Sequence, residues 1–138
     1  MNGEIQHKTL ISENNIQKIT FPDGSHIELN RKSELVYPEE FSEKERKVQL
    51  KKGEAFFKVK HAEDKAFKVE AGEVIVEVVG TEFYVKKSIK GNVEVSVKKG
   101  KVQVYNKGLA DNRTLLKSGE KAVVDISENK IKKSDNND

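Results

Sequence analysis

Cysteine and tryptophan are absent from this chain of 138 residues, and it contains only two prolines. Without cysteine there are no disulfides, no zinc sites built on thiolates and no cysteine nucleophile. Sugar-binding sites often use aromatic platforms, and here the tyrosines, Tyr37, Tyr84 and Tyr105, are widely spaced. These absences remove several classes of catalytic and binding site before any motif is considered.

Long apolar runs are also missing. No stretch approaches the roughly 18–20 apolar residues that a membrane-spanning helix needs. The polar segment from Met1 to Lys8 lacks the apolar core of a signal peptide. Taken by itself, the sequence is that of a soluble cytosolic protein. Taken as a piece of a longer protein, its ends carry no information about anchors or leaders.

Arginine is scarce among the charged residues. Lysine and arginine total 26 against 23 acidic residues, a net charge of +3, and the arginines are Arg31, Arg46 and Arg113. Nucleic-acid-binding proteins usually combine arginine forks with exposed aromatic rings. Lysines mixed evenly with acidic residues instead indicate a solvated surface, so we do not expect DNA or RNA binding.

The sequence is rich in apolar alternation with a period of two, which places one set of side chains on a buried face and the other in water. Val74, Val76 and Val78, for example, face one way, and Ile75 and Val79 face the other. The pattern predicts an all-β domain of about ten short, mostly antiparallel strands with little or no helix. It leaves open a two-layer sandwich, a barrel or a short β-solenoid-like stack.

Glycine-containing turns separate the runs at short intervals. Residues 22–24, Pro-Asp-Gly, supply a fixed φ, a side-chain cap and a positive φ in succession. At Gly80 the apolar phase changes from even to odd positions, which predicts a bulge or a sharp bend. Ser42 and Glu45 have the form of a capping box, but no apolar helical stripe follows, so we expect at most one helical turn there.

The length fits one domain. We divide the chain into a polar leader over residues 1–8, an all-β domain over residues 9–131 and a charged segment over residues 132–138. The last segment is interpreted as a tail or a linker to a further C-terminal domain.

Several short motifs occur together in order, and through them the chain resembles the FecR family from about Thr9 to Ile131. The family's usual leucine, proline and asparagine are replaced by Phe21, Ala66 and Tyr84, which are mild departures. The motifs, in chain order, are FPDGSHIELN (21–30), SELVYPEEF (33–41), RKVQL (46–50), GEAFFKV (53–59), AFKV (66–69), VGTEFYV (79–85), VSVKKGKV (95–102) and LKSGEKA (116–122).

The resemblance implies a place in a signalling chain. FecR domains lie in the periplasmic part of single-pass inner-membrane anti-sigma regulators, after a cytoplasmic segment and one transmembrane helix, and a small domain often follows. The regulator passes a signal from a TonB-dependent outer-membrane transporter to an extracytoplasmic-function sigma factor. We therefore expect the periplasmic signalling domain of the transporter as partner, directly or through a following domain. We expect contact with the sigma factor only through the cytoplasmic segment.

The family motifs are expected to be structural, since their residues turn strands and let backbones approach closely. The residues concerned are Pro22, Asp23, Gly24, Ser25, Leu29, Asn30, Tyr37, Pro38, Gly53, Glu54, Phe57, Phe67, Gly80, Thr81, Phe83 and Gly119.

No residue pattern points to catalysis, a metal or a cofactor. His7, His26 and His61 have no neighbour at metal-ligand spacing, and no nucleophile elbow, Walker loop or dinucleotide-binding glycine motif occurs. Most carboxylates fall on outward strand positions. Glu77 shares a face with apolar residues, so we expect it to be partly buried and paired, or to lie at an edge. We expect a binding protein that is not an enzyme and needs no cofactor or metal.

Phe56 is the candidate contact residue. It lies on the strand face opposite Ala55 and Phe57, between charged neighbours, and either packs in a second layer or forms an exposed apolar contact. An exposed strand edge is another docking route, through β-augmentation. The alternative function is a carbohydrate-binding β-sandwich module, which the missing tryptophan disfavours. A hydrolase with groove carboxylates is disfavoured by the lack of catalytic spacing.

Overall fold

The computed structural model describes residues 6–109 and 112–135, which form a sheet of 13 strands. A single three-residue 3₁₀ turn, η1 (Lys107–Leu109), is the only helical element in this part of the chain. The strands are β1 (His7–Ser12), β2 (Gln17–Thr20), β3 (His26–Leu29), β4 (Ser33–Pro38), β5 (Arg46–Lys58), β6 (Phe67–Ala71), β7 (Val74–Val78), β8 (Glu82–Lys87), β9 (Val93–Lys99), β10 (Lys101–Asn106), β11 (Thr114–Lys117), β12 (Glu120–Asp125) and β13 (Lys130–Asp135).

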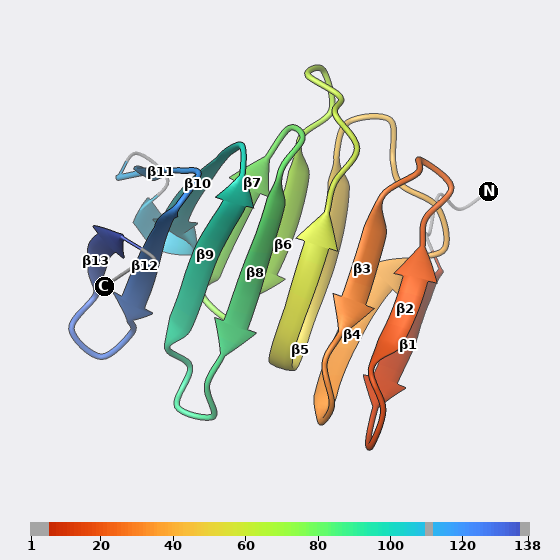
Figure 1. Cartoon of the computed structure of the whole chain (residues 1–138), viewed down its shortest axis with the longest axis horizontal. Helices are drawn as coiled ribbons and strands as arrows, with labels where there is room; N and C mark the ends of the chain where they lie inside the picture. The colour runs from red at the N-terminus through yellow and green to blue at the C-terminus, as the bar shows by residue number, and fades with distance from the viewer. Residues whose placement is uncertain (1–5, 110–111, 136–138) are drawn as a thin grey trace.

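The strands lie in two layers that share β5 (Figure 1). The first layer has the order β1-β4-β5-β6-β7-β10-β11, and the second has the order β2-β3-β5-β8-β9-β12-β13. β5 and β6 are parallel, and the other described pairs are antiparallel. The all-β class and the mostly antiparallel pairing are therefore confirmed.

The long strand β5 joins the layers because it changes layer along its length. Its first half pairs with β4 and β6, and from Gly53 onward it pairs with β3 and β8. Gly53 has a φ of +87°, a left-handed conformation that costs glycine little, and the strand turns there from one layer to the other.

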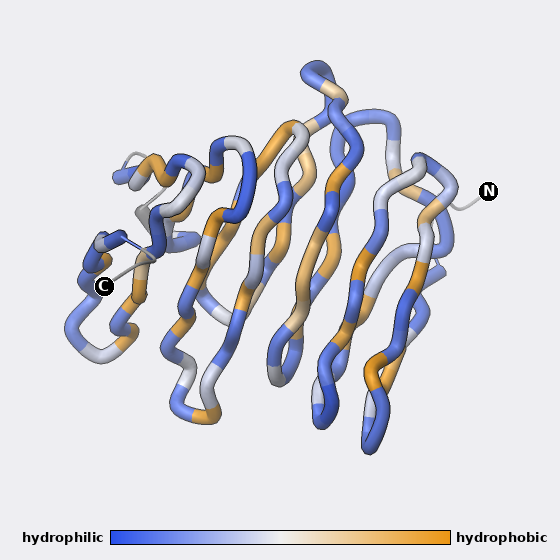
Figure 2. The backbone as a smooth tube through the Cα atoms, in the orientation of Figure 1, coloured by the Kyte–Doolittle hydropathy of each residue, from blue (hydrophilic) through white to orange (hydrophobic). Residues whose placement is uncertain are grey.

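The core lies between the layers and follows the predicted alternation. Phe57, Phe67, Val76 and Phe83 are fully buried, and Figure 2 shows apolar and polar residues alternating along most strands. The rings of Phe57 and Phe83 stack with centroids 5.1 Å apart. Burial of this kind is the main favourable contribution to folding.

The predicted change of apolar phase at Gly80 corresponds to a bend in the chain, followed by a shift in the register between β8 and β9. Val78 is buried, Val79 is 40% exposed and Phe83 is buried again. The register between β8 and β9 shifts between Glu82 and Phe83. The irregular segment returns the apolar side chains to the core face, as an added residue in a strand does.

Sequence analysis gives fewer strands than the structure has. β1 includes His7 and Lys8, which were assigned to a polar leader, and β13 includes residues 132–135, which were assigned to a tail. These edge strands are held by backbone pairing with β4 and β12, so they need little apolar alternation of their own. Residues 1–5 and 136–138 of the two assigned segments lie outside the described part of the chain. No helix among the described residues combines the length and hydropathy that a membrane crossing requires.

Candidate interaction site

The Pro-Asp-Gly-Ser turn after Phe21 is fixed by its own side chains. Asp23 Oδ1 accepts the Ser25 N–H at 2.9 Å, and Asp23 Oδ2 accepts the Ser25 hydroxyl at 2.9 Å. Gly24 has a φ of +93°, the left-handed conformation that favours glycine. The carboxylate therefore faces into the molecule and can bind a further donor.

That donor is the buried guanidinium of Arg46, at the start of β5. Nη1 donates to Asp23 Oδ2 at 3.0 Å and to the Lys60 carbonyl at 2.7 Å. Nε donates to the Lys65 carbonyl at 2.9 Å, and Nη2 donates to the Val79 carbonyl at 3.2 Å. One cation thus ties the turn at 22–25 to the 59–66 connection and to the bend before β8. Arg46 begins the family motif at 46–50, but its sequence context does not predict this role.

The network also sets the acidity of Asp23. Burial raises the pKa of the Asp23 carboxyl, but the hydrogen bonds from Ser25 and Arg46 outweigh burial and hold the pKa below its ordinary value. The Ser25 hydroxyl in turn accepts the Lys60 N–H at 3.0 Å. The polar atoms of the network are directed to one another, which is the arrangement of a network that stabilises a fold.

A second motif network surrounds the bend of β5. A methyl group on Gly53 would lie 2.6 Å from Ser33 Cβ, so only glycine fits. The Ser33 hydroxyl accepts the Glu54 N–H at 2.9 Å, and Asn30 Nδ2 donates to Glu54 Oε1 at 2.8 Å. These contacts fix the outward direction of the Glu54 and Asn30 side chains.

The remaining glycine motifs bring strands close together. A methyl group on Gly80 would lie 2.6 Å from the Cα of His61, and the Thr81 hydroxyl donates to the Lys101 carbonyl at 2.8 Å. Gly119 has a φ of +85°, and its N–H donates to the Val97 carbonyl at 2.9 Å. Of the other motif residues, Leu29, Phe57, Phe67 and Phe83 are buried, Tyr37 packs edge-on against Phe21, Pro22 begins the turn and Pro38 ends β4.

Phe56 lies on the outer face of the second layer. The strand register places Phe56 between Glu28 on β3 and Tyr84 on β8. The Phe56 and Tyr84 rings have centroids 4.6 Å apart, and Lys98 Nζ lies 5.7 Å from the centre of the Phe56 ring. Tyr84 is 43% exposed, so this aromatic pair faces solvent with no further layer of strands over it.

A shallow hollow of about 140 Å³ adjoins the aromatic pair. It combines an apolar floor with an amide and two carboxylates, a composition suited to an extended peptide or a small polar ligand. Glu28 has no ion pair or side-chain hydrogen bond among the described residues. We define the aromatic groove as the residues that line this hollow, which are Ile16, Glu28, Asn30, Glu54, Ala55, Phe56 and Tyr84.

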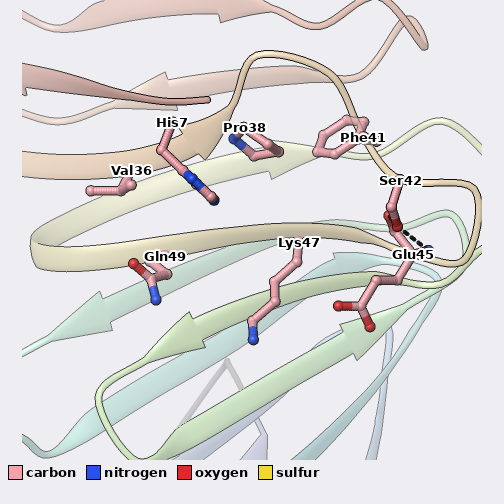
Figure 3. A pocket seen from close by; sticks show the side chains of 8 residues that line it. All are labelled: His7, Val36, Pro38, Phe41, Ser42, Glu45, Lys47 and Gln49. Carbon is pink, nitrogen blue, oxygen red and sulfur yellow. Dashed lines mark hydrogen bonds between the residues drawn. The ribbon is translucent and has the colours of Figure 1, made fainter. Parts of the chain in front are cut away.

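A second hollow, of about 200 Å³, lies on the outer face of the first layer under the 39–45 connection (Figure 3). Val36, Pro38 and Phe41 give it an apolar side, and His7 points into it from β1. Its charged side chains Glu45 and Lys47 have partners outside the hollow, Glu45 at 3.2 Å from Lys68 and Lys47 at 3.4 Å from Glu70.

The Ser42 hydroxyl accepts the Glu45 N–H at 3.2 Å and closes a single turn beside this hollow. This is the capping interaction of the predicted box, without a helix following it.

Glu77 is paired on the outer face of the first layer. Its Oε1 accepts the Tyr105 hydroxyl at 2.8 Å and lies 3.4 Å from Arg113 Nη1. The Arg113 guanidinium lies 4.2 Å from the centre of the Tyr105 ring. Burial and the Glu77 carboxylate raise the pKa of Tyr105 to about 12. Glu77 is thus partly buried and engaged in a local polar cluster.

The described residues contain no group of three or more His, Asp or Glu side chains that could hold a metal ion. The histidines are dispersed: His26 Nδ1 lies 2.9 Å from the Thr20 hydroxyl and His61 lies 3.6 Å from Glu63. The aromatic groove is therefore the candidate interaction site, because it combines the exposed ring of Tyr84 and the half-buried ring of Phe56 with a free carboxylate and a hollow.

Comparison with known proteins identifies related chains. The profile of the FecR protein family matches residues 8–103. Two crystal structures, each of a candidate anti-sigma factor from Parabacteroides distasonis, have the same fold. One has a TM-score of 0.84 and 30% identity over 94% of this chain and 60% of the other. The second has a TM-score of 0.83 and 31% identity over 93% of this chain and 59% of the other. This chain thus spans about three-fifths of the length of those proteins. No curated protein matches the chain.

Proposed function

This chain belongs to the FecR protein family, and from that premise we propose that it is the signal-relay domain of a transmembrane anti-sigma regulator. The domain lies in the periplasm. It links a TonB-dependent outer-membrane transporter to an extracytoplasmic-function sigma factor, which a cytoplasmic segment of the same regulator contacts.

The observation that carries the proposal is the match to the FecR profile over residues 8–103, together with the match to a candidate anti-sigma factor over 94% of the chain. The motif residues that produce the match stiffen the domain: Arg46 and Asp23 join three segments, and Gly53 fixes the bend of β5. A stiff two-layer domain can hold a neighbouring domain in a defined orientation.

The aromatic groove is the surface through which the relay domain contacts the transporter's periplasmic signalling domain. Exposed aromatic rings with polar groups at the rim are the side chains that most often dominate protein interfaces. Phe56 and Tyr84 supply the rings, and Glu28 supplies a carboxylate free to pair with a cation of the partner.

The domain acts by binding and not by catalysis. In support, Glu77 is engaged by Tyr105 and Arg113, and Glu70 is engaged by Lys47 and Lys107. Carboxylates committed to such pairs on an open strand face are poor candidates for general acid–base work on a substrate.

A pull-down with the transporter's signalling domain tests the proposal. The chain is the bait, and the matched variants are Tyr84→Ser in the aromatic groove and Leu115→Ser on the other layer, whose side chains are 43% and 42% exposed. We expect Tyr84→Ser to weaken binding about tenfold or more, as loss of an interface aromatic does. Leu115→Ser should bind like the unchanged chain. Absence of any binding by the unchanged chain would contradict direct contact between this domain and the transporter, and equal loss in both variants would contradict the assignment of the groove.

Carbohydrate binding is a second candidate function, and one observation favours it. The Phe56 and Tyr84 rings lie beside an amide and carboxylates, which together supply the stacking faces and hydrogen-bonding groups that sugars need. Titration of the chain with soluble glycans separates the two functions. Saturable glycan binding that Tyr84→Ser abolishes, without binding to the transporter domain, would replace the relay by a carbohydrate module.

A further inference from the structure

Ile89 is fully exposed at the tip of the β8–β9 turn, with a relative accessibility of 101%. The turn is held rigid by its neighbours: the Ser88 N–H donates to the Asn92 carbonyl at 2.9 Å, and the Gly91 N–H donates to the Ser88 carbonyl at 3.0 Å. Figure 2 shows an apolar point at the tip of this hairpin, between polar stretches. The fold therefore presents one large apolar side chain outward with nothing of its own to pack against.

Lysines flank Ile89 on both sides and on the adjacent strand. Lys90 lies in the turn and Lys87 ends β8. The register pairs Lys87 with Gly53, directly after Lys51 and Lys52. None of these lysines has an ion pair among the described residues. We define the basic tip as Lys51, Lys52, Lys87, Ile89 and Lys90.

The acidic side chains nearest the basic tip do not form ion pairs with its lysines among the described residues. Glu34 lies opposite Lys52 in the register, and Glu73 stands in the turn between β6 and β7. Glu54 and Glu94 both lie opposite Lys86, which is not part of the tip. The lysines beside Ile89 are therefore available to pair with an external anion.

We propose that the basic tip binds peripherally to an anionic lipid bilayer, with Ile89 inserted among the acyl chains and the lysines paired with lipid phosphates. An exposed apolar side chain at a hairpin tip, with unpaired lysines next to it, matches the order of a membrane interface, where charged groups lie outside the hydrocarbon. A nucleic acid would offer no apolar layer for Ile89, and the tip has no arginine or aromatic ring to read one. The inference is separate from the relay, since the basic tip and the aromatic groove share no residue.

Vesicle co-sedimentation of the chain measures the interaction, with phosphatidylcholine vesicles compared with mixed phosphatidylcholine and phosphatidylglycerol vesicles. A lysine near an anionic surface contributes about fivefold to partitioning, so the double variant Lys87→Gln/Lys90→Gln should bind roughly 25-fold more weakly. Lys58→Gln/Lys121→Gln removes the same charge elsewhere and should change binding far less. Ile89→Ser should also weaken binding to the mixed vesicles, by about tenfold for a loss of buried apolar surface of this size. Unchanged urea midpoints would show that these turn variants fold.

Tryptophan fluorescence gives a direct view of insertion because the chain contains no tryptophan. The Ile89→Trp variant should shift its emission to shorter wavelength with phosphatidylglycerol-containing vesicles, and Val123→Trp should not. The proposal is overturned if the unchanged chain ignores phosphatidylglycerol, or if the two double variants lose binding equally. It is also overturned if soluble polyglutamate produces the same Ile89→Trp shift, since the tip would then be an acidic-protein site.

Discussion

Replacing Arg46 with methionine should destabilise the domain strongly, because the guanidinium is 2% exposed and donates to four acceptors in three separate segments. Methionine keeps most of the apolar stem but leaves the Asp23 carboxylate without its cation and three carbonyls without a donor. Removal of one partner of a buried ion pair typically costs about 3–5 kcal/mol. Asp23 is itself 23% exposed and can be rehydrated in part, which favours the lower end, about 3 kcal/mol.

Urea unfolding followed by circular dichroism gives this free energy from the shift in midpoint at constant m-value. The matched control is Arg31→Met, whose side chain is exposed, with an expected change within about 0.5 kcal/mol. Asp23→Asn should cost less than Arg46→Met because the amide still accepts the Ser25 N–H. The double variant should show a coupling of roughly 0.5–3 kcal/mol. A loss of unfolding free energy below about 1 kcal/mol for Arg46→Met, or one equal to that of Arg31→Met, would refute the proposal that Arg46 holds the three segments together.

Three further results are expected. Phe57→Ala should lower the free energy of unfolding in urea by about 3–5 kcal/mol because the side chain is fully buried. Val123→Ala, at a side chain that is 38% exposed, should lower it by less than about 0.5 kcal/mol. Similar losses in the two variants would mean that the core face is misassigned. Gly53→Ala should lower the free energy of unfolding by about 2–4 kcal/mol and the thermal midpoint by several degrees, because φ is +87° and the added methyl has no room. An unchanged midpoint would argue against the bend. Stability should also fall at both pH extremes in pH-dependent unfolding. The pKa of Asp23 is lowered in the folded state, so its contribution is present above the unfolded value near 4 and disappears as pH falls below it. The pKa of Tyr105 is raised to about 12, so its contribution is lost between about pH 10 and pH 12, and a flat profile across either range would count against these networks.

Alternation alone was enough to predict the fold class and the core faces. Val76, which shares a predicted strand face with Val74 and Val78, is fully buried, and so is Phe57, which lies on the face opposite Phe56. The edge strands were harder to find because β13 carries lysines and owes its existence to pairing with β12, a contact that a local pattern does not encode. The exchange of β5 between layers at Gly53 likewise depends on which strands become its neighbours.

The candidate site was predicted in part. Phe56 was singled out from its position opposite the core residues, but its partner Tyr84 comes from a strand paired only in three dimensions. Arg46 was missed because a charged residue is normally assigned to the surface, and three of its four acceptors are backbone carbonyls that no sequence pattern distinguishes. A family motif that begins with arginine was the available signal.

The relay itself is tested most directly by sigma-dependent reporter induction in cells whose full-length regulator lacks residues 9–131, with uptake of the transported ligand measured in parallel. The account predicts that the transporter's ligand no longer induces the reporter while uptake stays normal. Normal, signal-dependent induction without these residues would contradict it.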